Sequence, residues 1–155
     1  MRVMMKRRHL LGAMATTAIV GLARSLASAA GPAEVVVFKD PACGCCGKWV
    51  EHLSRDGFKV KTVDSRDMAA VKKRLGVPDA LGSCHTAQVG GYVVEGHVPA
   101  SSIRRLLRDK PAVAGLAVPG MVSGSPGMEE AGKKQPFDVV YFDRAGRTGV
   151  FERVR

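Results

Sequence analysis

The pattern of hydrophobic and polar positions predicts alternating strands and helices. Residues 34–39 carry the run Val-Val-Val-Phe, typical of a strand that is buried on both faces, and the strand ends before Asp40. Apolar residues at helical spacing continue to Gly57, which favours a helix C-terminus, and residues 58–63 alternate as a second strand. Residues 33–63 are therefore predicted to form a β-α-β unit.

The middle of the chain predicts a second helix and two short strands. Asp67 can cap a helix that stops at Gly76, with apolar residues turned inward and the basic run 72–74 facing solvent. Residues 85–96 contain two short strand candidates around a Gly-Gly pair.

The C-terminal third predicts a helix, a long loop and a hairpin. The helix begins at Pro99 or Ser101 and turns its arginines toward solvent. A glycine-, serine- and proline-rich stretch over residues 118–135 lacks periodicity, as a functional or a mobile loop does. Residues 137–142 and 148–154 alternate on either side of a turn and close the chain as a hairpin. These elements together place the chain in the α/β class.

Residues 1–29 predict an export signal peptide. Basic residues at positions 6–8 precede an apolar stretch over 10–22, and the Ala-Ser-Ala that ends at Ala29 fits a cleavage site. The apolar stretch is shorter than the roughly 20 residues that span a bilayer, so no stable membrane anchor is expected. The arginine pair at 7–8 also resembles a twin-arginine signal, which exports folded proteins. The expected location is the periplasm.

The net charge of +10 falls when the predicted signal is removed. Nineteen basic and 14 acidic residues remain in residues 30–155, a net charge of +5. This excess suits an exported domain, and no aromatic-plus-basic stacking pattern accompanies it, so no nucleic-acid partner is expected. Residues 30–155 are long enough for one domain with its own core, without cysteines as staples.

Three of the four cysteines lie in one turn of backbone. Cys43 and Cys46 have the C-x-x-C spacing of a redox pair, and Cys45 stands between them as an extra soft ligand or a third redox partner. Such a cluster can share at most one long-range disulfide, to Cys84, so it indicates a redox or metal site rather than a set of structural disulfides. The start of a helix favours thiolate over thiol, which suits both nucleophilic attack and metal binding.

The order of elements and the Cys-Gly-x-Cys turn resemble thioredoxin-like folds. The resemblance implies a central mixed sheet with flanking helices, here followed by the C-terminal hairpin. In such folds the loop before the third strand packs against the cysteine turn, and residues 83–86 occupy that place in this chain. Cys84 would then face the other three cysteines. Thioredoxins have a cis-proline there, and its absence argues against an ordinary dithiol oxidoreductase.

Several further motifs resemble the CopG-like periplasmic copper-resistance proteins. The motifs are Asp40-Pro41 with Cys43-x-Cys45-Cys46, Trp49, Cys84-His85-Thr86, the stretch Gly91-Tyr92-Val93-Val94-Glu95-Gly96-His97-Val98-Pro99, and Gly120-Met121 with Gly124-Ser125-Pro126-Gly127-Met128-Glu129. The resemblance implies copper bound as a thiolate cluster by Cys43, Cys45, Cys46 and Cys84, and a role in copper redox handling.

The residue types favour copper independently of that resemblance. Thiolates and thioethers select Cu(I), although four thiolates also suit zinc or an iron–sulfur cluster. Adjacent Cys45 and Cys46 converge poorly on one tetrahedral ion, whereas a multinuclear Cu(I) cluster tolerates adjacent bridging donors. A metal-free disulfide role is the remaining alternative.

Five further residues are considered for the site. His85 is a secondary metal-ligand candidate, as are the loop methionines Met121 and Met128, and for each a plain structural role is the alternative. His97 is interpreted as structural, and a surface role is favoured for His52.

The sequence thus predicts an exported copper-binding protein that acts in copper resistance or copper redox handling. Its expected partners are copper ions and other periplasmic copper-handling or electron-transfer proteins. The alternative is a periplasmic thiol–disulfide oxidoreductase that acts on protein substrates, with Cys43 and Cys46 as its redox residues. A third hypothesis is an inert scaffold with two disulfides, because export leads to an oxidising compartment.

Overall fold

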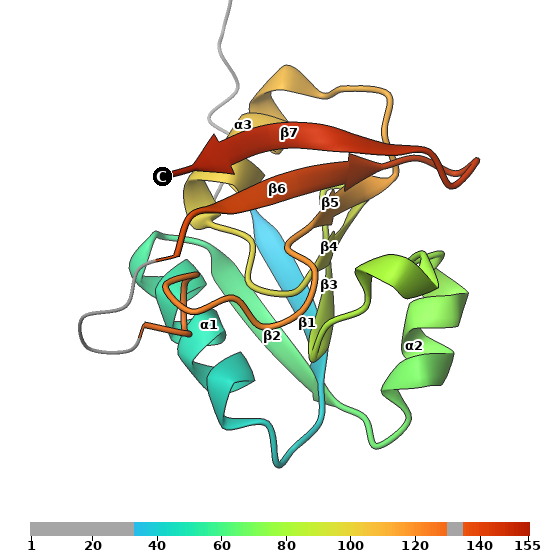
Figure 1. Ribbon diagram of the computed structural model, residues 1–155. Helices are drawn as coiled ribbons and strands as arrows, with labels where there is room; N and C mark the ends of the chain where they lie inside the picture. The colour runs from blue at the N-terminus through green and yellow to red at the C-terminus, as the bar shows by residue number, and fades with distance from the viewer. Residues whose placement is uncertain (1–32, 130–134) are drawn as a thin grey trace, which may run out of the picture.

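A seven-stranded mixed sheet with three α-helices forms the protein in the computed structural model (Figure 1). The structure describes residues 33–129 and 135–155. The predicted signal peptide over residues 1–29 and its cleavage site lie outside the described residues. No helix in the described ranges has both the length and the apolar character needed to cross a membrane.

The elements follow the predicted order along the chain. They are β1 (Glu34–Lys39), α1 (Gly44–Arg55), β2 (Lys59–Asp64), α2 (Met68–Leu75), the 3-10 turn η1 (Asp79–Leu81), β3 (His85–Val89), β4 (Tyr92–Glu95), α3 (Ala100–Asp109), β5 (Gly115–Ala117), β6 (Phe137–Phe142) and β7 (Thr148–Val154). The order of strands across the sheet is β2-β1-β3-β4-β5-β6-β7.

Strand pairing confirms the two local units predicted from periodicity. β1 and β2 are parallel on either side of α1, which is the β-α-β unit, and β6 pairs with β7 as the C-terminal hairpin. β3 and β4 form a second antiparallel hairpin, and β3 also pairs antiparallel with β1. β5 was not predicted. Its three residues are too few to show a period, and it joins β4 to β6.

Helix α2 begins and ends as predicted, but one of its basic residues does not face solvent. Asp67 Oδ1 accepts a hydrogen bond from the N–H of Ala70 at 2.9 Å, and Gly76 closes the helix with a φ of 71°. The expectation that Lys72 points to solvent is wrong, because its ammonium reaches the carboxylate of Glu95. Glu95 is fully buried in β4, so Lys72 neutralises a charge inside the protein.

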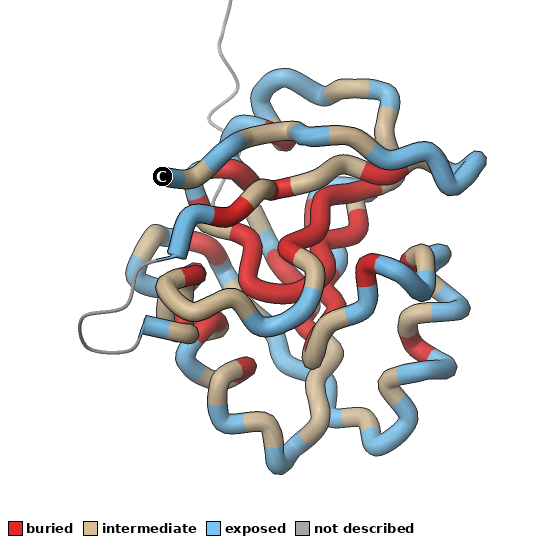
Figure 2. The backbone as a smooth tube through the Cα atoms, viewed as in Figure 1, coloured by how far each residue is buried: buried red, intermediate tan, exposed pale blue. Residues whose placement is uncertain are grey.

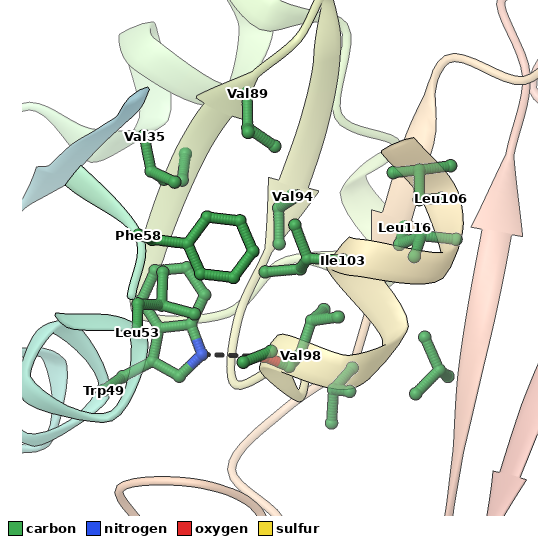
Figure 3. Close-up of a cluster of buried hydrophobic side chains, with 14 of the residues drawn as sticks. Val35, Trp49, Leu53, Phe58, Val89, Val94, Val98, Ile103, Leu106 and Leu116 are labelled. Atoms are coloured by element: carbon green, nitrogen blue, oxygen red, sulfur yellow. Dashed lines mark hydrogen bonds between the residues drawn. The ribbon is translucent and has the colours of Figure 1, made fainter. Parts of the chain in front are cut away.

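Helices α1 and α3 cover one face of the sheet and enclose the larger hydrophobic cluster (Figure 3). Trp49 and Leu53 from α1 and Ile103 from α3 are fully buried there, and each such side chain contributes about 1.5–3 kcal/mol. Trp49 Nε1 also donates a hydrogen bond to the carbonyl oxygen of Val98 at 2.9 Å. This bond ties the cysteine-bearing helix to the segment that leads into α3.

A smaller cluster lies on the opposite face of the sheet. Successive residues of a strand point to opposite faces, and Val93 belongs to the smaller cluster whereas Val94 belongs to the larger one. Figure 2 shows that buried residues gather along the central strands, whereas the edge strand β2 is mostly exposed. The cysteine helix thus rests on a sheet that is packed on both faces.

Candidate functional site

The cysteine cluster lies at the N-terminal end of α1. Asp40 arranges the turn before it, because its side chain accepts a hydrogen bond from the N–H of Ala42 at 2.8 Å and its carbonyl accepts one from Cys43 at 3.0 Å. Cys43 is the N-cap residue, so Cys45 and Cys46 fall in the first helical turn. The positive end of the helix dipole and the free N–H groups of this turn stabilise thiolates.

Cys84 approaches these residues from the other side of the site. It lies between η1 and β3, and its Sγ is 3.6 Å from Cys45 Sγ. Cys45 Sγ is also 3.5 Å from Cys43 Sγ, and all four sulfurs lie within 4.8 Å of one another. The structure therefore brings together the four cysteines that the sequence singled out.

The four sulfurs are not equivalent. Cys43 and Cys46 form a disulfide with a Cα–Cα distance of 5.5 Å, whereas Cys45 and Cys84 are free thiols within the described part of the chain. Cys46 is fully buried, and the other three are partly exposed. Two sulfurs are therefore available as thiols, and the other two become available after reduction by two electrons.

Two buried imidazoles flank Cys84. Its Sγ lies 3.5 Å from Nδ1 of His85 and 3.4 Å from Nε2 of His97. Both rings are fully buried, and burial lowers the pKa of His97 and lowers the pKa of His85 to about 3. Both imidazoles are thus neutral at neutral pH and each keeps one nitrogen lone pair.

The ring nitrogen that faces away from Cys84 has different surroundings in the two histidines. Nδ1 of His97 lies 2.8 Å from the carbonyl oxygen of Pro126, which can only accept, so Nδ1 carries the proton and Nε2 is unprotonated toward Cys84. Nε2 of His85 is buried and has no hydrogen-bond partner among the described residues. The His85 ring packs against Trp49, with ring centroids 4.4 Å apart.

Sequence reasoning gave His97 only a structural role, and the structure adds its place beside the thiol. The signal that would have found it is the register of the β3–β4 hairpin. Thr86 pairs with Glu95, so Cys84 and His97, each two residues further out, face one another at the open end. The sequence already predicts a strand on either side of the Gly-Gly pair, and pairing the two as an antiparallel hairpin would have given this register.

The glycine-rich loop covers the cysteine turn. A Cβ on Gly127 would lie 2.8 Å from the backbone nitrogen of Trp49 and 3.2 Å from the carbonyl oxygen of Cys45, so only glycine fits there. Gly127 also has a φ of +83°, which favours glycine independently of space. The loop predicted over residues 118–135 is therefore part of the site, at least up to residue 129.

The two loop methionines lie on this cover. Met121 is 61% exposed and follows Gly120, whose carbonyl accepts a hydrogen bond from Ser83 Oγ at 3.1 Å. Met128 is half-buried and follows Gly127.

His52 is not simply a surface residue: it is half-buried, and its Nε2 accepts the N–H of Ala100, the first residue of α3, at 3.1 Å.

The carboxylate of Glu95, to which sequence reasoning gave no role, anchors the loop that carries Cys84. It accepts the backbone N–H of Ser83 at 2.6 Å and the hydroxyl of Thr86 at 2.7 Å, besides the ammonium of Lys72. These residues lie on both sides of Cys84 in the sequence. No periodicity distinguishes a buried glutamate from a core position, so only the structure reveals this network.

One cavity in the described part of the chain lies away from the cysteines. A cavity of about 420 Å³ is lined by residues 112–114 and by the turn of the β6–β7 hairpin, and none of the cysteines lines it. This cavity is therefore not part of the cysteine site.

Comparison with solved structures shows the family of this chain. A copper resistance protein CopG structure (Form 2) is 46% identical, with a TM-score of 0.76 over 80% of this chain and 99% of that chain. The chain belongs to the CopG family of copper resistance proteins. A second CopG structure (Form 1) is 47% identical, with a TM-score of 0.75 over 79% of this chain and 97% of that chain. The resemblance drawn from the sequence motifs is confirmed.

The other comparisons add one match. Residues 81–128 match the family described as "Protein of unknown function, DUF411". This segment holds Cys84, both buried histidines and the glycine-rich loop, so it includes the half of the site outside α1. No curated protein matches the chain.

Proposed function

We propose that this CopG-family protein binds Cu(I) through Cys43, Cys45, Cys46 and Cys84 in copper resistance or copper redox handling. The observation that carries the proposal is the convergence of four sulfurs within 4.8 Å of one another at the start of α1. The copper-resistance function in the names of its structural relatives supports the choice of metal.

The donor set fits Cu(I). Thiolates are soft ligands that select Cu(I), and the helix N-terminus stabilises their negative charge. Cys45 and Cys46 are adjacent, which favours bridging sulfurs and more than one copper ion over a single tetrahedral ion. When bound, copper supplies one-electron redox chemistry. The Cys43–Cys46 disulfide must be reduced before all four sulfurs can bind metal.

Nitrogen donors extend the proposed site. Cys84, His85 and His97 offer one sulfur and two ring nitrogens that lie within 4.8 Å of one another. The carbonyl of Pro126 holds the His97 ring with Nε2 unprotonated, as the partner of a metal-binding histidine does. Met121 and Met128 are proposed as further thioether donors on the loop.

A thioredoxin-like fold and export complete the proposal. The order β2-β1-β3-β4, with β1 and β2 parallel and β3 antiparallel to β1, supports a thioredoxin-like core to which β5 and the β6–β7 hairpin are added. Residues 1–29 act as the signal peptide, and the protein works in the periplasm with copper-handling or electron-transfer partners. The sequence pattern of residues 1–29 supports this location.

Anaerobic Cu(I) titration of the reduced protein tests the proposal. We expect more than one Cu(I) per chain, and fewer for Cys45→Ser because it loses the central sulfur. The same titration without prior reduction should bind less copper, because two sulfurs are then in the disulfide. A stoichiometry of one or less for the reduced protein, or normal binding by Cys45→Ser, would contradict the multinuclear site.

A thiol–disulfide oxidoreductase is the second candidate, and the Cys43–Cys46 disulfide at a helix start favours it. An insulin-reduction assay separates the two functions. Thioredoxin-like turnover that persists with stoichiometric Cu(I) would support the oxidoreductase, whereas suppression by Cu(I) would support copper binding.

A further inference from the structure

Cys45 and Cys84 form a second pair of sulfurs beside the disulfide. Their sulfurs are 3.6 Å apart, although the residues are 39 positions apart in the sequence. A disulfide bond is about 2.05 Å long, so an approach of roughly 1.5 Å would join them. Cys45 lies in the first turn of α1, and Cys84 lies in the loop before β3. Small rotations of these two side chains can supply this movement.

Cys45 is also in contact with the existing disulfide. Its Sγ lies 3.5 Å from Cys43 Sγ, which is bonded to Cys46. The four sulfurs lie within 4.8 Å of one another, and successive contacts connect them in the order Cys46, Cys43, Cys45 and Cys84. Thiol–disulfide exchange requires a thiolate next to a disulfide sulfur, and Cys45 occupies that place.

From these contacts we propose that Cys45 and Cys84 are a second dithiol–disulfide couple, and that Cys45 transfers the disulfide between the two pairs. The Cys45 thiolate attacks Cys43 Sγ, which forms a Cys43–Cys45 bond and releases the Cys46 thiolate. Cys84 then gives its proton to the released Cys46 thiolate and attacks Cys45 Sγ, which forms Cys45–Cys84 and releases Cys43. The protons of Cys45 and Cys84 pass to Cys43 and Cys46, and no electrons are gained or lost overall.

Two features of the site favour the transfer. The released Cys46 thiolate lies in the first turn of α1, where the helix dipole stabilises negative charge. The second disulfide connects α1 to the loop before β3, and that loop is already fixed by the carboxylate of Glu95 through the N–H of Ser83. Transfer therefore needs no rearrangement of the sheet.

The second couple gives the cluster three oxidation levels. Fully reduced protein has four thiols, the one-disulfide form has two, and the fully oxidised form has two disulfides and no thiol. Oxidation from the first level to the last loses four electrons and four protons to an external disulfide or another thiol oxidant. The number of soft ligands thus follows the redox state. This inference rests on sulfur geometry and does not depend on the proposed copper binding.

Differential alkylation of the metal-free, full-length chain in a chelating buffer tests the transfer. One-disulfide protein is equilibrated, its thiols are blocked with light N-ethylmaleimide, and after reduction the released thiols are labelled with heavy reagent. We expect heavy label on Cys45 and Cys84 as well as on Cys43 and Cys46. Heavy label confined to Cys43 and Cys46 would overturn the transfer.

Oxidation with excess oxidised glutathione tests the second couple. We expect loss of both remaining thiols, a monomer on a non-reducing gel, and a Cys45–Cys84 peptide in the digest. Two persistent thiols, glutathione adducts or disulfide-linked dimers would overturn it. Cys84→Ser is the matched control, because it keeps the Cys43–Cys46 disulfide and should never lose its single thiol by internal bonding. The loss of both thiols and the Cys45–Cys84 peptide are measured on the unmodified chain, so the test stands even if Cys84→Ser folds poorly.

Neither experiment contains copper. A chain that fails to bind Cu(I) but shows heavy label on Cys45 and Cys84 keeps this inference and loses the proposed function. A chain that binds Cu(I) but shows heavy label only on Cys43 and Cys46 keeps the proposed function and loses this inference.

Discussion

Nδ1 of His97 donates a hydrogen bond to the carbonyl oxygen of Pro126 at 2.8 Å, while Nε2 on the other side of the ring lies 3.4 Å from Cys84 Sγ. A residue of the glycine-rich loop therefore fixes the tautomer of a buried histidine that faces the cysteine cluster. The loop acts on the site through the imidazole as well as by covering the helix.

Replacing His97 should weaken Cu(I) binding. His97→Ala removes a neutral nitrogen donor held toward Cys84, and we expect a loss of about 10–100-fold in affinity, the range for disturbed metal-site partners. Competition with a chromogenic Cu(I) chelator measures it. His52→Ala is the matched control, because its ring contacts the N–H of Ala100 and not a cysteine. Equal losses in the two variants would contradict a role for His97 in the site.

Removing Lys72 should destabilise the fold more than neutralising Glu95 does. Glu95 is fully buried, whereas the Lys72 side chain is 18% exposed and can hydrate. Lys72→Met leaves a buried carboxylate without its cation and should cost about 3–5 kcal/mol in urea unfolding. Glu95→Gln keeps hydrogen-bonding capacity and should cost less.

The double variant provides the control for this pair. Lys72→Met with Glu95→Gln has no buried charge, so it should recover part of the stability lost by Lys72→Met alone. Strictly additive losses would show that the two side chains do not interact as the structure indicates.

Sequence periodicity was sufficient for most elements but not for the residues around Cys84. The run in β1 and the alternation in the β6–β7 hairpin are long enough to identify a strand, whereas β5 has three residues and no period. Lys72 follows Val71 on an amphipathic helix, and nothing local reveals that its side chain bends toward a buried acid.

The cysteines themselves were identified because their chemistry is visible in their spacing. Three thiols in one turn indicate a site without knowledge of the fold, whereas the resemblance to thioredoxin-like folds was needed to place the distant Cys84 nearby. His97 needed the register of the β3–β4 hairpin, and the cover by Gly127 needed the path of an aperiodic loop. The register follows from a local turn once the two strands are paired, whereas the path of the loop comes from tertiary packing, which local patterns do not encode.

Gly127→Ala should disturb both the fold and the cysteine turn. The added Cβ would meet the backbone nitrogen of Trp49 at 2.8 Å, and the backbone at Gly127 has a φ of +83°. A left-handed conformation costs about 1–2 kcal/mol for a residue with a Cβ, and the clash adds to it. Urea unfolding and the alkylation rate of Cys45 should both change.

Gly120→Ala separates the clash from the backbone effect. Gly120 has a similar φ of +73°, but its added Cβ would meet no atom within 4 Å. This variant should show the conformational cost alone and leave Cys45 alkylation unchanged. Equal effects at the two glycines would mean that the loop does not press on the cysteine turn.

The reactivity of Cys84 should depend on pH and on Cys45. Burial, followed by the hydrogen bond and charge of Cys45, raises the pKa of the Cys84 thiol from 9.0 to about 11. The folded protein therefore keeps the proton through a range in which the unfolded chain loses it. The stabilisation of the fold by the protonated Cys84 thiol is fully present below pH 9 and is lost as the pH rises toward about 11.

Iodoacetamide labelling of Cys84, followed by mass spectrometry across this range, should show half-maximal rate near pH 11 in the folded protein. Cys45→Ser removes the neighbouring thiol and should shift that midpoint to lower pH, because only the contribution of burial remains large. An unchanged midpoint in Cys45→Ser would show that the two sulfurs do not share a proton, and a wild-type midpoint near 9 would show that the thiol is not shielded from water.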